Sequence, residues 1–199
     1  MESQRHIVVP PPDPILDAAR ACVLDVGLRR TTLADVARRA GVSRMTVYRQ
    51  YGDLSAIVSA LLSAELLGLM ESARVEAAMQ PTARERLVEE GVLVVERLAQ
   101  HPLWCKVLDL DPELLLPLVV DRFGSSQRAA VELVAAQVEE GQREGSVRPG
   151  DPQLLATCLL LTAQSFVFSA RIIAAQHKSE HTGAELRRLL HGYLLPEAR

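Results

Sequence analysis

The chain has 199 residues, of which 48% are hydrophobic and 4% aromatic, and its formal net charge at pH 7 is −3. This length allows one domain or two small ones, and the apolar content suffices for a substantial core, so disorder is excluded for most of the chain. The small net charge argues against a protein that coats nucleic acid or membrane indiscriminately.

The charge is unevenly distributed along the sequence. Residues 1–60 contain eight arginines and six acidic residues (+2), whereas residues 61–199 contain 14 basic and 19 acidic residues (−5). A basic N-terminal part on an acidic body allows one end of the molecule to meet an anionic partner. Alanine, leucine, valine, arginine and glutamate dominate, so we predict an all-α protein of about nine helices.

The first predicted element is an N-terminal arm, residues 1–13, which contains three consecutive prolines and is expected to be mobile. Asp13 can cap a helix whose first position is Pro14. Apolar residues recur at helical spacing from Ile15 to Val26, and Gly27 ends the helix.

A compact pair of short helices follows. Thr32, with Asp35 three residues later, resembles a capping box and begins a helix of about two and a half turns. Gly41 provides a sharp turn, Ser43 can cap the next helix, and Val47 gives that helix an inward face. Two helices joined by such a turn form the pattern of a DNA-reading helix-turn-helix. The alternative is a plain helix pair with surface arginines that caps a helical bundle.

The outward face of the second helix is predicted to carry Arg44, Met45, Thr46, Tyr48 and Arg49. The first arginine can bind a guanine or a phosphate, and methionine and threonine can contact base edges or thymine methyl groups. Tyrosine and the second arginine are better placed to bind the phosphate backbone, and Thr32 can help to hold a phosphate at the start of the preceding helix.

Further helices are predicted for the rest of the chain, and Asp53 can cap the first of them. Their expected ranges are 54–79, 82–100, 126–144, 153–176 and 182–195, with short helices in 102–123 and a loop at 145–152. The uncharged stretch 153–170 is long enough to be considered as a membrane span, but its polar residues argue against one. We expect this helix to be buried on two faces, one against its own core and one against a second subunit.

The last predicted helix has an apolar stripe that is a candidate dimer interface, formed by Leu186, Leu189, Leu190, Tyr193 and Leu194. Paired with the preceding helix, it would form a four-helix bundle between two subunits. The alternative is that the stripe packs only inside its own subunit.

A candidate ligand pocket is lined by apolar residues between the DNA end and the dimer seam, namely Trp104, Leu108, Leu115, Phe123, Phe166 and Phe168. Any of them can equally be plain core. Arg171 can meet an anionic group of a ligand or form an ordinary ion pair.

No catalytic, cofactor or metal motif stands out. His177 and His181 are four residues apart but lie in a polar linker, and no nucleophile elbow, phosphate loop or dinucleotide fingerprint occurs. The three cysteines are far apart and the N-terminus lacks a signal pattern, which favours the cytoplasm. We expect no enzyme activity, no cofactor, no bound metal and no membrane association.

Three segments resemble the tetracycline-repressor-like (TetR) family of bacterial regulators: IleLeuAspAlaAlaArg at 15–20, ThrThrLeuAlaAspValAla at 31–37 and AlaGlyValSerArgMetThrValTyrArgGlnTyr at 40–51. The resemblance covers roughly residues 14–60 and includes the spacing of the whole three-helix block. It implies a DNA-binding domain at 14–60, a divergent helical domain at 61–199 that binds a small molecule, and a homodimer formed by the last two helices.

The resemblance also implies site residues. It assigns DNA contacts to Thr32, Arg44, Met45, Thr46, Tyr48 and Tyr51, with Ser43 as a cap. Met45 stands where the family often has glycine, and Leu54 stands where it often has lysine. The latter change removes one phosphate contact, for which Arg49 or Arg30 can substitute.

We therefore expect a homodimeric repressor that a small-molecule effector releases from a palindromic DNA operator. The effector would bind one conformation of the dimer better than the other. The competing hypothesis is a helical interaction module whose helix pair binds a protein partner instead of DNA.

Overall fold

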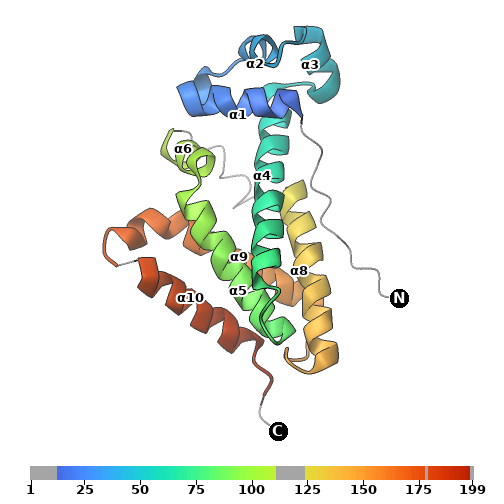
Figure 1. Cartoon of the computed structure of the whole chain (residues 1–199), viewed down its shortest axis with the longest axis vertical. Helices are drawn as coiled ribbons and strands as arrows, with labels where there is room; N and C mark the ends of the chain where they lie inside the picture. The colour runs from blue at the N-terminus through green and yellow to red at the C-terminus, as the bar shows by residue number, and fades with distance from the viewer. Residues whose placement is uncertain (1–12, 111–123, 178, 198–199) are drawn as a thin grey trace. The chain divides into compact units, whose positions relative to one another are not determined.

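The computed structural model of the chain describes residues 13–110, 124–177 and 179–197. In these ranges it contains nine α-helices, one 3₁₀-helix and no strand, which confirms the predicted all-α fold (Figure 1). The elements are α1 Pro14–Val26, η1 Leu28–Arg30, α2 Leu33–Ala40, α3 Arg44–Tyr51, α4 Leu54–Ala77, α5 Ala83–Gln100, α6 Pro102–Leu110, α8 Ser125–Glu144, α9 Pro152–Ala174 and α10 Ser179–Leu194. The predicted arm up to residue 12 and the part of the predicted short-helix region at 111–123 lie outside the described residues.

The chain divides into two compact units. One contains Met1–Gly68 and His101–Arg122, and the other contains Leu69–Gln100 and Phe123–Arg199. The first unit thus holds α1 to α3, the beginning of α4, and α6, which packs against α1. The domain boundary predicted from the sequence lies at residue 60, and no sequence pattern indicates that α6 belongs to the first unit.

Local signals determine the helix ends in the first unit. The side chain of Asp13 accepts a hydrogen bond from the Ile15 backbone N–H at 2.8 Å, with Pro14 in the first position of α1. Asp53 likewise accepts from Ala56 N–H at 2.8 Å at the start of α4. These caps agree with the sequence-based prediction, whereas η1 was not predicted.

Contacts of one carboxylate connect α1, α4 and the start of α6 in the first unit. Glu65 on α4 lies 2.9 Å from Arg20 on α1 and 3.2 Å from His101, which directly precedes α6. The His101 and Glu65 side chains are 12% and 20% exposed, so this contact is largely shielded from solvent.

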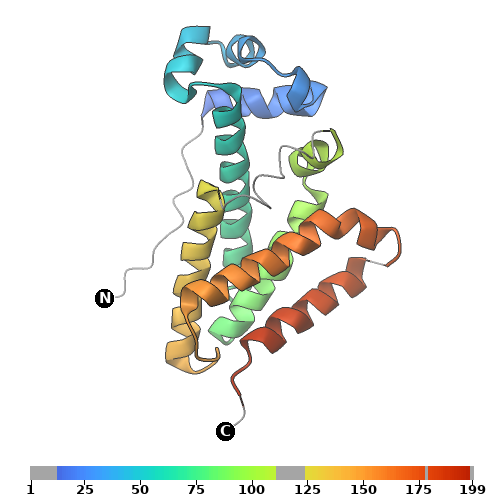
Figure 2. The same ribbon diagram turned by 180° about the vertical axis from the view of Figure 1, so that it is seen from behind.

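In the second unit, α5 packs against α8, α9 and α10. Figure 2 shows α9 crossing α5, with α10 beside it. The buried face of α5 carries Leu87, Val88, Val92, Val95 and Leu98. Gly91 interrupts this face, and a β-carbon there would lie 3.0 Å from Leu190 of α10, so glycine lets the two helices approach closely.

A carboxyl group lies inside the second unit. Glu90 of α5 is 5% exposed, and its Oε2 accepts a hydrogen bond from Gln137 of α8 at 3.0 Å. Burial raises the pKa of Glu90 to about 7, against the lowering effects of the Gln137 hydrogen bond and of Arg74. Arg74 compensates little for the free-energy cost of burying the Glu90 carboxylate, because it already forms two hydrogen bonds with Glu71, at 2.8 and 3.0 Å.

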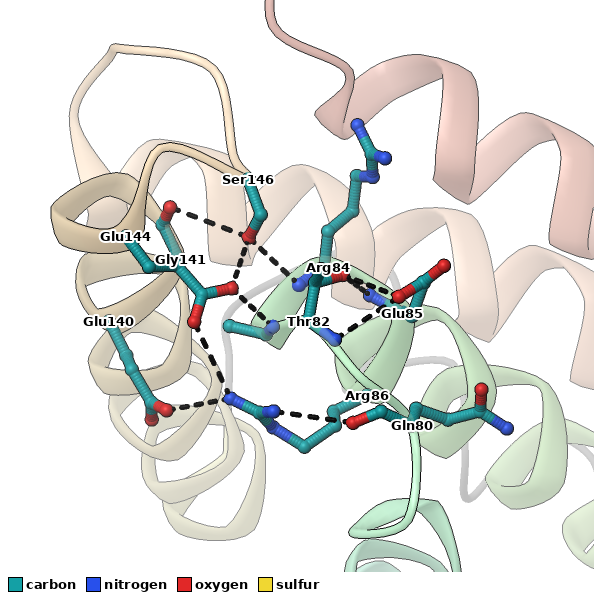
Figure 3. Close-up of polar contacts among 10 residues, drawn as sticks. Gln80, Thr82, Arg84, Glu85, Arg86, Glu140, Gly141, Glu144 and Ser146 are labelled. Carbon is teal, nitrogen blue, oxygen red and sulfur yellow. Dashed lines mark hydrogen bonds and ion pairs between the residues drawn. The ribbon is translucent and has the colours of Figure 1, made fainter.

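A polar clamp joins the beginning of α5 to the end of α8 (Figure 3). The Glu144 carboxylate accepts from the Ala83 backbone N–H at 2.5 Å and from the Ser146 hydroxyl at 2.6 Å. Arg86 donates to Glu140 at 2.7 Å. The hydrogen bonds from Ser146 and Ala83 lower the pKa of Glu144, so its charged form stabilises the clamp.

Candidate nucleic-acid interface

A left-handed glycine makes the turn between α2 and α3. Gly41 has φ 69° and ψ 24°, a conformation that costs other residues free energy. The N–H of Gly41 donates to the Arg38 carbonyl at 3.4 Å, and the N–H of Val42 donates to the Ala37 carbonyl at 3.0 Å. This Schellman pattern satisfies the last carbonyls of α2 and sends the chain directly into α3.

Small buried residues hold the two helices together. Val36 and Ala37 of α2 and Val47 of α3 are at most 2% exposed, as the sequence predicts. Val47 is the single fully buried side chain among the eight residues of α3. The rest of α3 is therefore available to solvent or to a partner, apart from the half-buried Thr46 and Tyr51.

Hydroxyl groups cap the beginnings of both helices. Thr32 accepts from Asp35 N–H at 3.2 Å and donates to the Asp35 carboxylate at 2.6 Å, which lowers the pKa of that carboxyl group. Ser43 accepts from Thr46 N–H at 3.0 Å, and the Ser43 and Thr46 hydroxyls lie 2.8 Å apart. Thr31 is buried instead, and its hydroxyl donates to the Gly27 carbonyl at 2.9 Å.

The outward face of α3 combines large apolar and cationic side chains. Met45 is 71% exposed and Tyr48 is 60% exposed. Arg44 and Arg49 are exposed as well, and neither guanidinium has a hydrogen-bond or ion-pair partner among the residues that the structure describes. The face predicted from the sequence is thus an accessible surface in the structure.

Arginines elsewhere in the first unit are already engaged. Arg38 lies 3.1 Å from Asp35, and Arg39 lies 2.6 Å from Asp25. Arg30, a predicted substitute for a missing phosphate contact, donates from Nε to the Val26 carbonyl at 2.8 Å. The uncompensated positive charge next to the turn therefore belongs to α3, where an anionic backbone can approach it.

The end of α3 carries hydrogen bonds that the sequence does not indicate. The resemblance implies a DNA contact for Tyr51, but this residue is half-buried and its hydroxyl donates to the Asp13 carboxylate. Gln50, which is not among the predicted contact residues, donates to the same carboxylate at 2.9 Å. Burial and the hydrogen bond to Asp13 raise the pKa of Tyr51 to about 12. In this structure the Tyr51 side chain links the last turn of α3 to the residue that caps α1.

The predicted pocket residues are divided between the two units. Trp104, which is buried, and Leu108 lie in the first unit. Phe166 and Phe168, both half-buried, and the exposed Arg171 lie on α9 in the second unit. Leu115 and Phe123 lie outside the described residues, so the pocket stays a prediction.

The predicted dimer stripe divides between core and surface. Leu186, Leu190 and Leu194 are at most 3% exposed and pack inside their own unit, which is the alternative that the sequence left open. Tyr193 is half-buried, with the Arg148 guanidinium 4.6 Å from its ring centre. Leu189 is 54% exposed and can meet a partner.

Three of the exposed large apolar residues of the second unit lie on α9. Leu154, Leu161 and Ile172 are 60%, 45% and 67% exposed, and their spacing places them on one face of the helix. By length and composition alone, α4 and α9 could each cross a membrane, a test that long apolar helices of soluble proteins also pass. Among the described residues there is no group of three or more His, Cys, Asp or Glu side chains that could hold a metal ion.

The sequence is similar to those of bacterial transcription regulators. The sequence model for bacterial regulatory proteins of the tetR family matches residues 15–61. An HTH-type transcriptional regulator from Mycobacterium tuberculosis is 41% identical over 180 residues, which cover 90% of this chain and 92% of that protein. The HTH-type regulator YhgD from Bacillus subtilis is 23% identical over 77% of this chain and 81% of its own length.

Solved structures share the fold. The TetR family repressor AlkX from Dietzia sp. has a TM-score of 0.69 and 18% identity, covering 90% of this chain and 92% of its own. The regulator FadR from Bacillus subtilis, in complex with stearoyl-CoA, has a TM-score of 0.65 and 18% identity, covering 91% and 98%. At this level of identity, the similarity concerns the fold alone.

Proposed function

Because this chain belongs to the TetR family of bacterial regulatory proteins, which are DNA-binding transcriptional regulators and not enzymes, we propose that it acts as a homodimeric repressor. A small-molecule effector releases it from a palindromic operator. Its DNA-binding domain comprises residues 14–60, and residues 61–199 bind the effector and the second subunit. The protein works in the cytoplasm, where it reaches the operator.

The observation that carries this proposal is the exposed face of α3. A helix with a single fully buried side chain, Val47, projects two arginines that have no partner in the described part of the chain. The major groove admits a helix, arginine binds guanine bidentately, and apolar side chains contact thymine methyl groups. In this proposal Arg44, Met45 and Thr46 read base edges.

Positioning contacts to the phosphate backbone complete the proposed interface. Tyr48 and Arg49 are exposed one turn further along α3 and bind phosphates. Thr32 and Ser43 cap the two helices, so the free N–H groups of the first turns meet phosphate oxygens next to these hydroxyls.

A second copy of the chain is the proposed occupant of the apolar face of α9. Leu154, Leu161 and Ile172 together with Leu189 of α10 offer the exposed apolar residues that a self-complementary interface needs. Two copies present two α3 helices, which suits operator half-sites about 34–36 Å apart or a multiple of that distance.

The effector is proposed to be a largely apolar small molecule. FadR from Bacillus subtilis, which shares the fold, binds stearoyl-CoA, and the half-buried Phe166 and Phe168 are the proposed apolar contacts here. An effector that prefers one conformation of the dimer shifts its population and changes operator affinity reciprocally.

The proposal is tested with DNA selected from a pool of random-sequence duplexes by the purified protein. We expect a palindromic site, and we expect Arg44→Ala to lose about 1–3 kcal/mol of binding free energy and to relax the preference at one base pair. Arg128→Ala is the matched control, because this exposed arginine lies in the second unit. Failure to select any duplex at low salt refutes the proposal.

A further inference from the structure

The carboxylate of Asp13 accepts hydrogen bonds from two helices. Its Oδ1 accepts from the backbone N–H of Ile15 at 2.8 Å, which caps α1. Its Oδ2 accepts from the side-chain amide of Gln50 at 2.9 Å and from the hydroxyl of Tyr51, both in the last turn of α3. Figures 1 and 2 both show the beginning of α1 beside α3. One side chain thus links the start of α1 to the end of α3.

The cap on α1 uses only one of the two carboxylate oxygens of Asp13. Serine, threonine or asparagine would cap α1 with the one acceptor that the helix needs. An aspartate adds a second oxygen and a negative charge that both oxygens share, and hydrogen bonds to a charged acceptor are stronger than those between neutral groups. The contact of Asp13 with Gln50 and Tyr51 uses this additional oxygen.

The helix that Asp13 contacts has few other attachments. Val47 is its single fully buried side chain, and the cap at its beginning is formed by Ser43 through local bonds to Thr46. A single buried residue holds a short helix in place but restricts its rotation about the helix axis less strongly. Side chains that read base edges must be held within about 0.5 Å and 10–20°. The bonds to Asp13 supply a second attachment at the opposite end.

We propose that Asp13 is a positioning residue for base reading by α3, an inference that rests on the function proposed above. Asp13 sets the rotation of α3 about its axis and thereby decides which base edges Arg44 and Thr46 meet. The Tyr51 hydroxyl, whose pKa is raised to about 12 by burial and by Asp13, is protonated near neutral pH as any tyrosine is, so it can donate to Asp13.

Two substitutions separate this contact from the cap. Asp13→Asn keeps an oxygen for the Ile15 N–H but replaces the acceptor of Gln50 and Tyr51 by an amide group that donates. Tyr51→Phe removes a single donor and keeps the half-buried ring. Asp17→Asn is the matched control, because Asp17 is exposed in the first turn of the same helix and loses the same charge.

The measured quantity is the ratio of two affinities. The wild-type protein first selects its preferred duplex from a random-sequence pool, and each variant is then titrated with that duplex and with a scrambled one at one salt concentration. We expect Asp13→Asn to lower the ratio at least about fivefold, which is the lower end of the effect of one mismatched base pair. We expect Tyr51→Phe to lower it by a smaller factor and Asp17→Asn to leave it unchanged.

The ratio distinguishes positioning from stability. A smaller folded fraction or a change of net charge alters both affinities by the same factor, whereas a rotated α3 weakens the selected duplex alone. An unchanged ratio for Asp13→Asn, in a variant that circular dichroism shows to be folded, overturns the inference and leaves the proposed function intact. Equal losses for Asp13→Asn and Asp17→Asn overturn it as well. A wild-type protein that selects no duplex overturns both.

Discussion

Replacing Glu90 by glutamine should stabilise the protein at neutral and alkaline pH. Glu90 is 5% exposed and its carboxylate must shed most of its hydration on folding. Gln137 donates one hydrogen bond to it, and the nearby Arg74 is engaged with Glu71. A glutamine at position 90 has nearly the same shape and can still accept the hydrogen bond from Gln137 through its carbonyl oxygen.

The expected effect follows from the difference in pKa between the folded and unfolded states. Burial raises the pKa of Glu90 from the reference value of 4.5 to about 7 in the folded protein. Between these values the folded state holds the proton more tightly than the unfolded state, so the free energy of unfolding falls as the pH rises. Since one pKa unit corresponds to about 1.4 kcal/mol, the free energy of unfolding of the wild-type protein falls by about 3 kcal/mol between pH 4.5 and pH 8. The Glu90→Gln variant does not show this decrease.

Urea unfolding at several pH values between 5 and 8 measures the difference, at one protein concentration because self-association also stabilises the folded state. We expect the free energy of unfolding of Glu90→Gln to exceed that of the wild type by about 3 kcal/mol at pH 8 and to approach it near pH 5. Glu139→Gln on the exposed side of α8 is the control and should follow the wild type. A Glu90→Gln variant that is less stable than the wild type at pH 8 would refute the reasoning, because it would mean that the folded protein favours the charged carboxylate.

Two further predictions concern the turn and the last helix. Gly41→Ala should destabilise the first unit by about 1 kcal/mol, because a β-carbon meets nothing within 4 Å and only the left-handed backbone conformation opposes the substitution. Thermal unfolding measures this change, and a loss of stability above about 3 kcal/mol would contradict the prediction. Leu186→Ala should cost about 2–5 kcal/mol of unfolding free energy. Leu189→Ala should change that free energy by less than about 0.5 kcal/mol and weaken self-association in analytical ultracentrifugation, and the opposite pattern would reverse the assignment of core and surface.

Local features of the fold could be predicted because their causes are local in sequence. Asp13, Thr32, Ser43 and Asp53 each cap a helix that begins with the next residue, and the structure confirms all four. The turn at Gly41 is equally local, since its conformation and its hydrogen bonds involve neighbouring residues. These elements position α3, so the exposed face of the candidate site could be read from the sequence.

Contacts between distant residues could not be predicted in the same way. The periodicity of α10 indicates an apolar stripe but does not say whether a core or a partner covers it, and three of its leucines pack inside the unit. The hydrogen bond between Tyr51 and Asp13 joins residues 38 positions apart, and no sequence pattern indicates it. Glu90 could have been noticed, because it follows Leu87 by three positions on the buried face of α5.

The clamp of Glu144 on Ala83 joins two chain segments that are 61 residues apart. Terminal amides of a helix ordinarily exchange with solvent deuterium early, because no carbonyl of the same helix accepts from them. Here the amide of Ala83 is sheltered for as long as α8 keeps its last turn. Fraying at the C-terminal end of α8 therefore exposes the first amide of α5. We expect these two helix ends to unfold together.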